Sequence, residues 1–325
     1  MHILGIETSC DETAAAVVKD GKIVLSNIIA SSLKDHQPYG GIIPEIASRR
    51  QLELISAVIQ RSLKVAGRRL SSIDAVAVTQ GPGLIGSLLV GISYARALSY
   101  AAQKPLAEID HIKAHLYANF LLPLKKKRGK KRNASPALPA VGLIVSGGHT
   151  ALYAIENFAH FRLMGQTRDD AAGEAFDKVA RILDLGYPGG PVIERLARNV
   201  KETSIRFPQA ELPGTLDFSF SGIKTSVLTF KQAHRTRCSF PTNEVAYAFQ
   251  KSVVGILVKK CLLACRQEKV KSLLVGGGVA ANTALRQELE RKAGCRGIRV
   301  SFPERPLCMD NAAMIAGFAY HTLNK

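Results

Sequence analysis

The chain has 325 residues, 46% of them hydrophobic, which is typical of a globular protein with two domains. Lysine and arginine outnumber acidic residues 44 to 26, and the net charge of +18 favours an acidic partner, nucleic acid before an anionic membrane. No apolar run is long enough to cross a bilayer, the N-terminus lacks an export pattern, and the six cysteines are scattered, so we expect a cytoplasmic protein with reduced thiols.

The N-terminal segment predicts three strands around a polar turn. Apolar stretches at 2–8, 14–18 and 23–29 have strand length, and Asp20-Gly21 is typical of a hairpin turn. The turn at residues 9–13, Ser-Cys-Asp-Glu-Thr, offers hydroxyls, N–H groups and a carboxylate. These groups suit a phosphate or a hydrated metal, although a plain β-turn explains them equally well.

A helix, a buried strand and a glycine-rich loop follow. The helix passes through Leu52, Ile55 and Ile59, and residues 73–79 read as a strand. The loop at residues 80–87, Gln-Gly-Pro-Gly-Leu-Ile-Gly-Ser, opens a second helix and could hold a phosphate at the helix N-terminus. It lacks the lysine of a P-loop, and close packing of strand on helix is an equal alternative.

Two histidines, His111 and His115, stand four residues apart behind a short strand. That spacing puts both imidazoles on one face of a helix, for which Asp110 is a suitable N-cap. A bare pair of this kind is more often an ordinary surface or core feature. A metal site needs a third ligand from elsewhere in the chain.

A basic block divides the sequence into two candidate domains, 1–133 and 134–325. Seven positive charges in eight residues cannot form a core, so we expect a loop or linker there. The closing helix is assigned to the second domain, with the option of packing back on the first. The basic residues are Lys125, Lys126, Lys127, Arg128, Lys130, Lys131 and Arg132.

The second half of the chain repeats the order of predicted elements found in the first half. Residues 140–145 form a strand, 146–150 a polar turn, and 151–155 and 161–165 two more strands. We therefore predict an α/β fold made of a duplicated domain, with both polar turns facing a ligand in a cleft between the halves.

Further elements complete this half. Acids in the first turn mark a helix from Asp169, and a triple glycine at 276–278 would let a flat nucleoside base lie against backbone. The closing helix begins near Asp310, for which helix cap is the default role. The remaining predicted elements are a break at Tyr187-Pro188, a helix start after Ser221, a helix at 244–267, and strands at 272–275 and 298–302.

Many motifs, in order along nearly the whole chain, resemble one family. The sequence is similar to the tRNA threonylcarbamoyladenosine transferase family TsaD, once described as O-sialoglycoprotein endopeptidases, in its bacterial and organellar branch. Besides the histidine pair, the motifs that carry the resemblance are GIETSCDET (5–13), GPGLIGSLLVG (81–91), VSGGHT (145–150), GEAFDK (173–178), YPGGP (187–191), FSFSGIKT (218–225), GGGVAAN (276–282) and MDNAAMIA (309–316).

The resemblance implies an actin-like, sugar-kinase-like fold of two α/β domains. It also implies transfer of a threonylcarbamoyl group from threonylcarbamoyl-AMP to N6 of adenosine 37 in tRNAs reading ANN codons. Implied partners are tRNA and, beyond it, a shorter paralogue of the same fold with a small P-loop ATPase, or a second copy of the chain. The basic block would then contact tRNA phosphates.

The resemblance also assigns site residues. His111, His115 and Asp310 match metal ligands, a set that suits Fe(II) or Zn(II). Asp11 is our candidate for a polar or proton-handling role at the carbonyl, and Glu12 is a weaker one. The second domain would supply most contacts to the activated substrate, through Val145, Ser146, Gly147, Gly148, His149, Asp177, Gly190 and Asn282.

Three positions depart from the family pattern, and three other functions compete, one of them a non-catalytic RNA-binding scaffold that leaves the metal group unexplained. Lys113-Ala114 replaces a common Glu-Gly, and Gln51 stands where many bacterial members have histidine. A nucleotide-dependent kinase or ATPase of the same fold is the main alternative. A metallopeptidase ranks lowest, because Ile112 occupies the place of the general-base glutamate in His-Glu-x-x-His.

Overall fold

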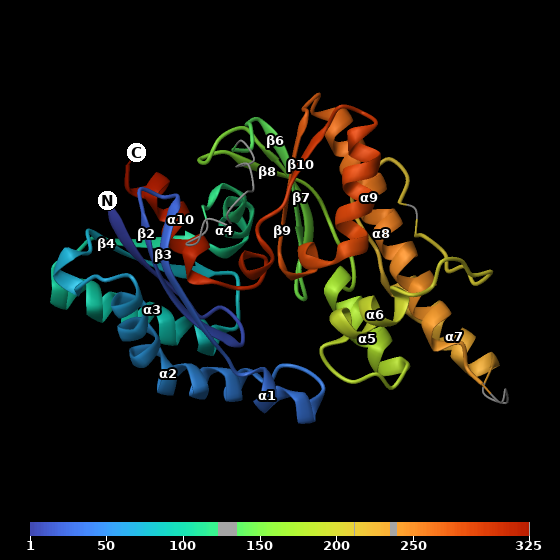
Figure 1. The fold of residues 1–325 in the computed structure, drawn as a ribbon, viewed down its shortest axis with the longest axis horizontal. Helices are drawn as coiled ribbons and strands as arrows, with labels where there is room; N and C mark the ends of the chain where they lie inside the picture. The colour runs from blue at the N-terminus through green and yellow to red at the C-terminus, as the bar shows by residue number, and fades with distance from the viewer. Residues whose placement is uncertain (123–134, 211, 235–238, 325) are drawn as a thin grey trace. The chain divides into compact units, whose positions relative to one another are not determined.

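The computed structural model describes residues 1–122, 135–210, 212–234 and 239–324. The chain divides into two compact units. Unit 1 comprises Met1–Pro136 and Pro303–Lys325, and unit 2 comprises Ala137–Phe302. Each unit is built on one five-stranded sheet (Figure 1).

The sheet of unit 1 contains β1 His2–Glu7, β2 Glu12–Lys19, β3 Ile23–Ser31, β4 Ala75–Gly81 and β5 Leu106–Asp110. The strand order is β3-β2-β1-β4-β5. The first three strands pair antiparallel across short turns, whereas β1, β4 and β5 pair in parallel. Parallel neighbours need a crossover, and the two long helices that follow β3 and β4 provide it.

Helices cover both faces of this sheet. On one face, Leu4 and Ile6 share a buried cluster with Ile55 of α2 (Pro44–Val65) and Ala95 of α3 (Ile85–Ala102). Gly5 points the opposite way, as strand alternation requires, and a Cβ there would collide with α10 (Ala312–Leu323). The histidine helix α4 (His111–Tyr117) packs beside α10. Short helices complete the unit: α1 Leu33–His36, η1 Gln37–Tyr39, η2 Leu70–Ser72, η3 Ala118–Phe120 and η5 Arg305–Leu307.

The closing segment belongs to unit 1, although the sequence boundary placed it in the second domain. Residues 312–319 of α10 are all buried, so this helix is apolar around its whole circumference and needs cover on every side. β1, β2 and α4 provide that cover. Tyr117 of α4 reaches both the Gly21 carbonyl and His321 near the end of α10.

The sheet of unit 2 contains β6 Ala140–Val145, β7 Thr150–Ile155, β8 Phe161–Gln166, β9 Ser272–Gly276 and β10 Arg299–Ser301. Its order is β10-β9-β6-β7-β8. The three consecutive strands pair antiparallel, and β6, β9 and β10 pair in parallel. Strand by strand this is the topology of unit 1, so the predicted duplication is confirmed.

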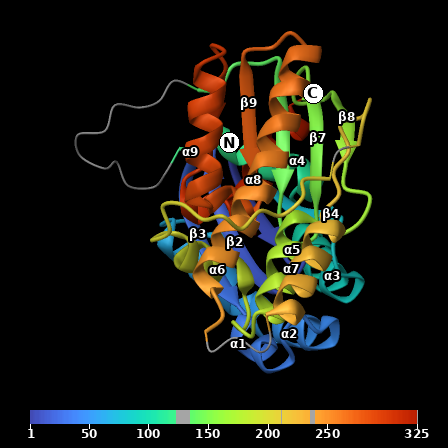
Figure 2. The same ribbon diagram turned by 90° about the vertical axis from the view of Figure 1, so that its right-hand side faces the viewer.

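The helices of unit 2 are α5 Ala172–Ile182, α6 Gly189–Ala197, α7 Ser221–Ala233, α8 Thr242–Gln267, η4 Gly278–Ala281 and α9 Thr283–Gly294. Figure 2 shows α8 and α9 in front of the strands of this sheet. α8 packs on α6, α9, β6 and β9. Across the described residues, no helix combines the length and apolar character that a membrane span requires.

One predicted helix start in unit 2 is wrong. α5 begins at Ala172 rather than Asp169, because the Asp169 carboxylate instead accepts hydrogen bonds from the backbone and hydroxyl of Ser221, at the start of α7. Asp170 pairs with Lys178 and Lys224. The glycine run at 276–278 leads first into the 3₁₀ turn η4 and only then into α9.

Candidate metal centre and substrate site

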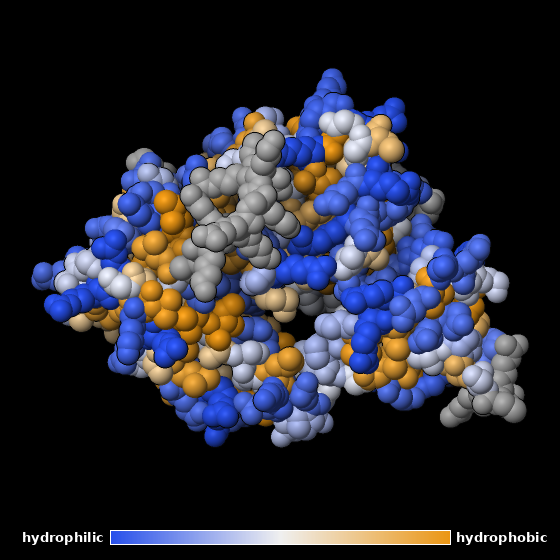
Figure 3. Space-filling view, in the orientation of Figure 1, coloured by the Kyte–Doolittle hydropathy of each residue, from blue (hydrophilic) through white to orange (hydrophobic). Residues whose placement is uncertain are grey.

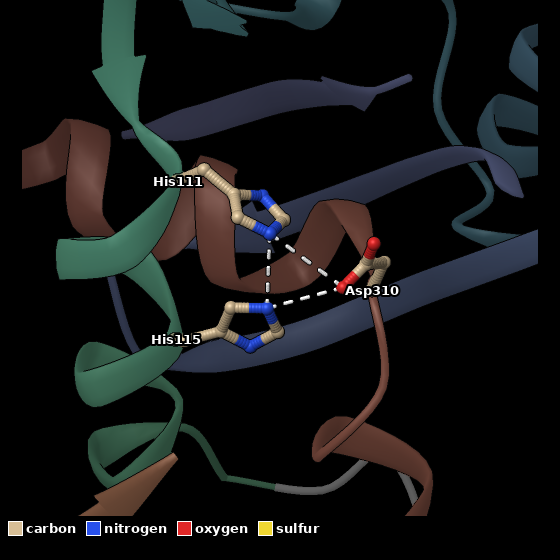
Figure 4. A group of neighbouring side chains, drawn as sticks. All are labelled: His111, His115 and Asp310. Atoms are coloured by element: carbon tan, nitrogen blue, oxygen red, sulfur yellow. Dashed lines mark hydrogen bonds and ion pairs between the residues drawn. The ribbon is translucent and has the colours of Figure 1, made fainter. Parts of the chain in front are cut away.

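The histidine pair lies on α4, as predicted. Asp110 caps the helix, with its carboxylate accepting the Lys113 N–H at 2.9 Å. His111 and His115 are both buried, and their Nε2 atoms lie 3.1 Å apart. The rings project from consecutive turns of the helix (Figure 4). Ala114, which lies between the two histidines in sequence, is fully buried. The departure from the family pattern at Lys113-Ala114 therefore leaves both imidazoles in place.

Asp310 joins this pair, and the role of helix cap falls to its neighbour. The side chain of Asn311 accepts the Met314 N–H and caps α10, so the predicted cap role of Asp310 is wrong. The Asp310 carboxylate instead points at the two imidazoles (Figure 4). Its Oδ1 lies 3.1 Å from His115 Nε2 and 3.6 Å from His111 Nε2.

This group of three side chains fits a divalent metal. Its potential ligand atoms all lie within 4.8 Å of one another. A metal with bonds of about 2.0–2.2 Å in tetrahedral geometry holds its ligand atoms roughly 3.3–3.5 Å apart, close to the observed separations. Two imidazoles and one carboxylate leave coordination positions for a substrate, which is typical of catalytic rather than structural sites.

The two histidines sit in different electrostatic environments. Burial works to lower the pKa of His111, but the carboxylates of Glu7 and Asp310 outweigh it and raise that pKa to about 9. Burial and the neighbouring His111 lower the pKa of His115. Each imidazole must be deprotonated at the nitrogen that binds a metal, so metal binding at this group releases protons near neutral pH.

The polar turn between β1 and β2 lies against the histidine helix. Ser9 Oγ is 3.3 Å from His111 Nδ1, and Asp11 is buried. Burial, reinforced by the charges of Asp11 and Asp310, raises the pKa of Glu12 to about 10. The turn therefore presents one buried acidic candidate, Asp11, and a second carboxyl group that favours its protonated form in the absence of a cation.

The glycine-rich loop after β4 packs against the polar turn between β1 and β2. Leu84 N–H donates to the Ser9 carbonyl at 2.8 Å, and a Cβ on Gly83 would fall 2.5 Å from the same oxygen. The loop thus packs closely against the polar turn, and its phosphate-binding role stays a prediction.

Two residues of this site were given no role by the sequence, although Gln51 stood out there as a departure from the family pattern. Glu7 is fully buried at the end of β1, 3.0 Å from His111 Nδ1. Gln51 is fully buried on α2, and its Nε2 faces the carbonyls of Thr8, Cys10 and Glu12. Only the position of Glu7 directly before the polar turn could have pointed to it.

The predicted substrate residues all belong to unit 2. The turn of Val145 to His149 is closed by the Ser146 N–H, which donates to the His149 carbonyl at 2.8 Å. Gly173 N–H donates to the Ser146 carbonyl at 3.1 Å, which brings the first turn of α5 against this loop. Gly277 approaches the carbonyl of Val145 from the other side. No side chain would fit at either glycine, and neither Gly147 nor Gly148 is crowded in this way.

Asp177 and Gly190 meet at the start of α6. The Asp177 carboxylate accepts the Gly189 N–H at 2.7 Å and also the Gly190 N–H. Burial raises the pKa of Asp177 despite these two bonds. This aspartate therefore already works as a cap for α6.

Asn282 caps α9 and contacts α8. Its Oδ1 accepts the Leu285 N–H at 3.0 Å, and its Nδ2 donates to Gln250 Oε1 at 2.8 Å. Glu194 of α6 accepts the N–H of the next residue, Thr283. Side chains of α6 and α8 thus meet the N-terminus of α9 at Asn282 and Thr283. The predicted tRNA-binding block, Lys125 to Arg132, lies outside the described residues.

Two α/β units of one topology define the actin-like, sugar-kinase-like fold, and one of them holds a His-His-Asp group whose geometry fits a metal ion. Solved structures support this fold. Full-length HypF in its phosphate- and nucleotide-bound form is similar with a TM-score of 0.62 at 14% identity, over 100% of this chain and 47% of that one. Component A of (R)-2-hydroxyglutaryl-CoA dehydratase from Acidaminococcus fermentans gives 0.57 at 16% identity, with complete coverage of both chains.

Sequence comparison identifies the family. Residues 23–317 match the model of TsaD, tRNA N6-adenosine threonylcarbamoyltransferase, and the chain belongs to this family. The tRNA N6-adenosine threonylcarbamoyltransferase of Clostridium perfringens is 48% identical, over 99% of this chain and 93% of the relative. That of Caldicellulosiruptor saccharolyticus is also 48% identical, over 100% and 94%.

Proposed function

We propose that this chain transfers the threonylcarbamoyl group of threonylcarbamoyl-AMP to N6 of adenosine 37 in tRNAs that read ANN codons. The observation that carries the proposal is the convergence of His111, His115 and Asp310 in a chain that matches the family along nearly its whole length. In the reaction, N6 attacks the carbamoyl carbon, the bond from that carbon to the phosphate oxygen breaks, and AMP leaves. One N6 proton must pass to a base.

The chain's contribution is placement of a weak nucleophile against an activated carbonyl. An exocyclic adenine amine reacts slowly unless it is held in line, and positioning alone is worth several kcal/mol, about 7–11 in the best cases. Asp11, at the buried polar turn, is the residue we propose for proton handling. Val145 to His149, Asp177, Gly190 and Asn282 are proposed to hold the adenylate.

We propose Fe(II) or Zn(II) as the ion held by His111, His115 and Asp310. A bound ion would polarise a substrate oxygen as a Lewis acid. Alanine at any of the three positions should abolish metal binding while the protein stays folded. Metal content by mass spectrometry and the circular dichroism spectrum test this together. Glu45→Ala, which removes an exposed carboxylate of the same unit, is the control. Full metal content in Asp310→Ala would refute the site.

The partner proteins are also a proposal. Leu52 of α2 and Ile85 and Leu89 of α3 are 69%, 79% and 58% exposed, and hydrophobic patches interrupt the hydrophilic surface in Figure 3. Exposed apolar side chains on neighbouring helices are typical of surfaces that a protein partner covers. A shorter paralogue of the same fold would fit this surface, with a small P-loop ATPase completing the set. A homodimer is the alternative outcome.

The decisive experiment is nucleoside mass spectrometry of tRNA. The purified chain is incubated with tRNA, threonine, bicarbonate, ATP and a threonylcarbamoyl-AMP synthase, with and without the paralogue and the ATPase. Threonylcarbamoyladenosine at position 37, absent with Asp310→Ala, is the expected result. ATP turnover by the chain alone, without the synthase or the ATPase, together with unmodified tRNA when the full partner set is present, would favour a kinase or ATPase instead.

A further inference from the structure

A fully buried carboxylate, Glu7, lies directly behind the metal group. Its Oε1 accepts the Ser9 N–H at 2.5 Å, and its Oε2 accepts the Thr79 hydroxyl at 2.5 Å. His111 Nδ1 lies 3.0 Å from the same Oε2. A buried carboxylate without donors is strongly destabilising, so these contacts have to come from N–H and O–H groups.

This contact decides which nitrogen of His111 carries a proton. A carboxylate only accepts hydrogen bonds, so Nδ1 must present its N–H to Glu7. In the neutral ring the lone pair then belongs to Nε2, the atom that faces His115 and Asp310. Glu7 thereby selects the tautomer in which Nε2 can bind a metal.

His115 has no equivalent support. Its Nδ1 is buried and finds no hydrogen-bond partner among the residues that the structure describes. The ring is held by packing alone on that side. The two imidazoles are therefore unequal ligands: Glu7 holds the Nδ1 side of His111, whereas no side chain of the described residues holds the Nδ1 side of His115.

We propose that Glu7 is a positioning residue of the metal centre, which fixes the ring and tautomer of His111 and so increases the affinity of the site for a divalent ion. The inference rests on the proposed metal site at His111, His115 and Asp310. Because Glu7 also holds the Ser9 backbone, one carboxylate ties the polar turn that carries Asp11 to the metal-binding helix. Loss of such an outer partner typically costs 10–100-fold in metal affinity.

The test is Zn²⁺ affinity of the full chain, measured by competition with a chromophoric chelator. Glu7→Gln keeps the shape but lowers the acceptor strength, and Glu7→Asp keeps the charge but withdraws it by one methylene. Both should weaken Zn²⁺ binding about 10–100-fold. Thr79→Val is the matched control, since it removes another hydrogen bond to the same Oε2 and leaves the acceptor of His111 in place. Its affinity should stay within about threefold of wild type.

A second measurement separates positioning from general stability. In the Zn²⁺-loaded protein, the His111 Nδ1–H proton should give a downfield, slowly exchanging NMR signal that moves upfield in Glu7→Gln. Lower thermal stability of the Glu7 variants with unchanged Zn²⁺ affinity would overturn the inference while Asp310→Ala still abolished binding. Zn²⁺ binding that survives in Asp310→Ala would overturn the metal site and this inference together.

Discussion

Gln51 holds the polar turn of unit 1 through a single nitrogen. Its Nε2 lies 2.9 Å from the Cys10 carbonyl and 3.1 Å from that of Glu12. Gln51→Leu keeps the volume but removes the donor, so these buried carbonyls lose a partner. We expect a loss of about 1–3 kcal/mol in the free energy of unfolding, measured by urea denaturation.

The neighbouring residue gives the control for this prediction. Leu52 lies on the same helix but is 69% exposed, so Leu52→Gln should change the free energy of unfolding by less than about 0.5 kcal/mol. Equal stability of the two variants would show that the turn does not depend on Gln51.

Asn282 can be tested without losing its helix cap. Asn282→Asp keeps the oxygen that accepts the Leu285 N–H but replaces the nitrogen that donates to Gln250. If Asn282 holds the adenylate as proposed, binding of AMP measured by calorimetry should weaken at least about tenfold, the effect of roughly 1.4 kcal/mol. Asn282→Ala should additionally cost about 1 kcal/mol of stability. A parallel loss of binding and stability in both variants would instead indicate a structural role.

Among single residues, the sequence predicts those whose side-chain chemistry and spacing are distinctive. It does not predict those whose role comes only from contacts made in the folded chain. The four-residue spacing of His111 and His115 indicates a shared helix face, and Asp110 is recognisable as a cap. Asp310 and Asn311 are both good caps, however, and no local pattern decides which of the two faces the histidines. Glu7 and Gln51 act across contacts of 104 and 41 residues in sequence, which no short pattern contains.

At the scale of the elements, the docking of α10 should depend on pH. His321 near its C-terminal end lies 3.0 Å from the Tyr117 hydroxyl of α4. Burial, with the nearby charge of Lys22, lowers the pKa of His321 below its ordinary value of 6.5. The unfolded chain therefore binds this proton more readily than the folded one. Its contribution to stability is present above pH 6.5 and is lost as the pH falls toward the lowered pKa.

Thermal unfolding of the wild type and of His321→Asn between pH 5 and 7.5 tests this expectation. The wild type should lose stability more steeply on the acid side, by at most ~1.4 kcal/mol for each pH unit from one proton. The difference between the two proteins isolates His321 from the other groups that titrate there. Parallel curves would show that α10 docking is insensitive to this histidine.

Strands and helices themselves follow well from the pattern of apolar residues. Every strand of both sheets overlaps a stretch that the sequence marks, and the central strands β1, β4, β6 and β9 are apolar because they are buried. The strands against which α10 packs cannot be predicted from the apolar pattern in the same way. Its eight buried residues require cover on all sides, but nothing in them specifies β1 rather than β6, and the choice depends on features such as the missing side chain of Gly5.

For the molecule as a whole, the excess of basic side chains indicates a binding partner rather than a feature of the fold. Internal ion pairs leave the net charge unchanged, so the +18 charge is available to an anionic partner. A tRNA substrate accounts for this excess better than the small adenylate, which a few side chains can neutralise. The basic block is the densest part of that charge.

Our last prediction concerns this block and the salt dependence of tRNA binding. It begins a few residues beyond Leu122, whose backbone is hydrogen bonded to Lys22 and Val24 at the edge of the unit 1 sheet. We expect seven basic side chains so close in sequence to α4 to contact phosphates near the target base. Each phosphate contact adds about 0.7–0.9 to the slope of log affinity against log salt. Replacing all seven with serine should therefore weaken tRNA binding and flatten that slope, while affinity for AMP and Zn²⁺ stays unchanged.

Replacing only the five lysines, Lys125, Lys126, Lys127, Lys130 and Lys131, with arginine keeps the charge and should preserve the slope. Fluorescence anisotropy over a salt titration measures both, and an unchanged slope in the serine variant would leave the block without a role in binding tRNA.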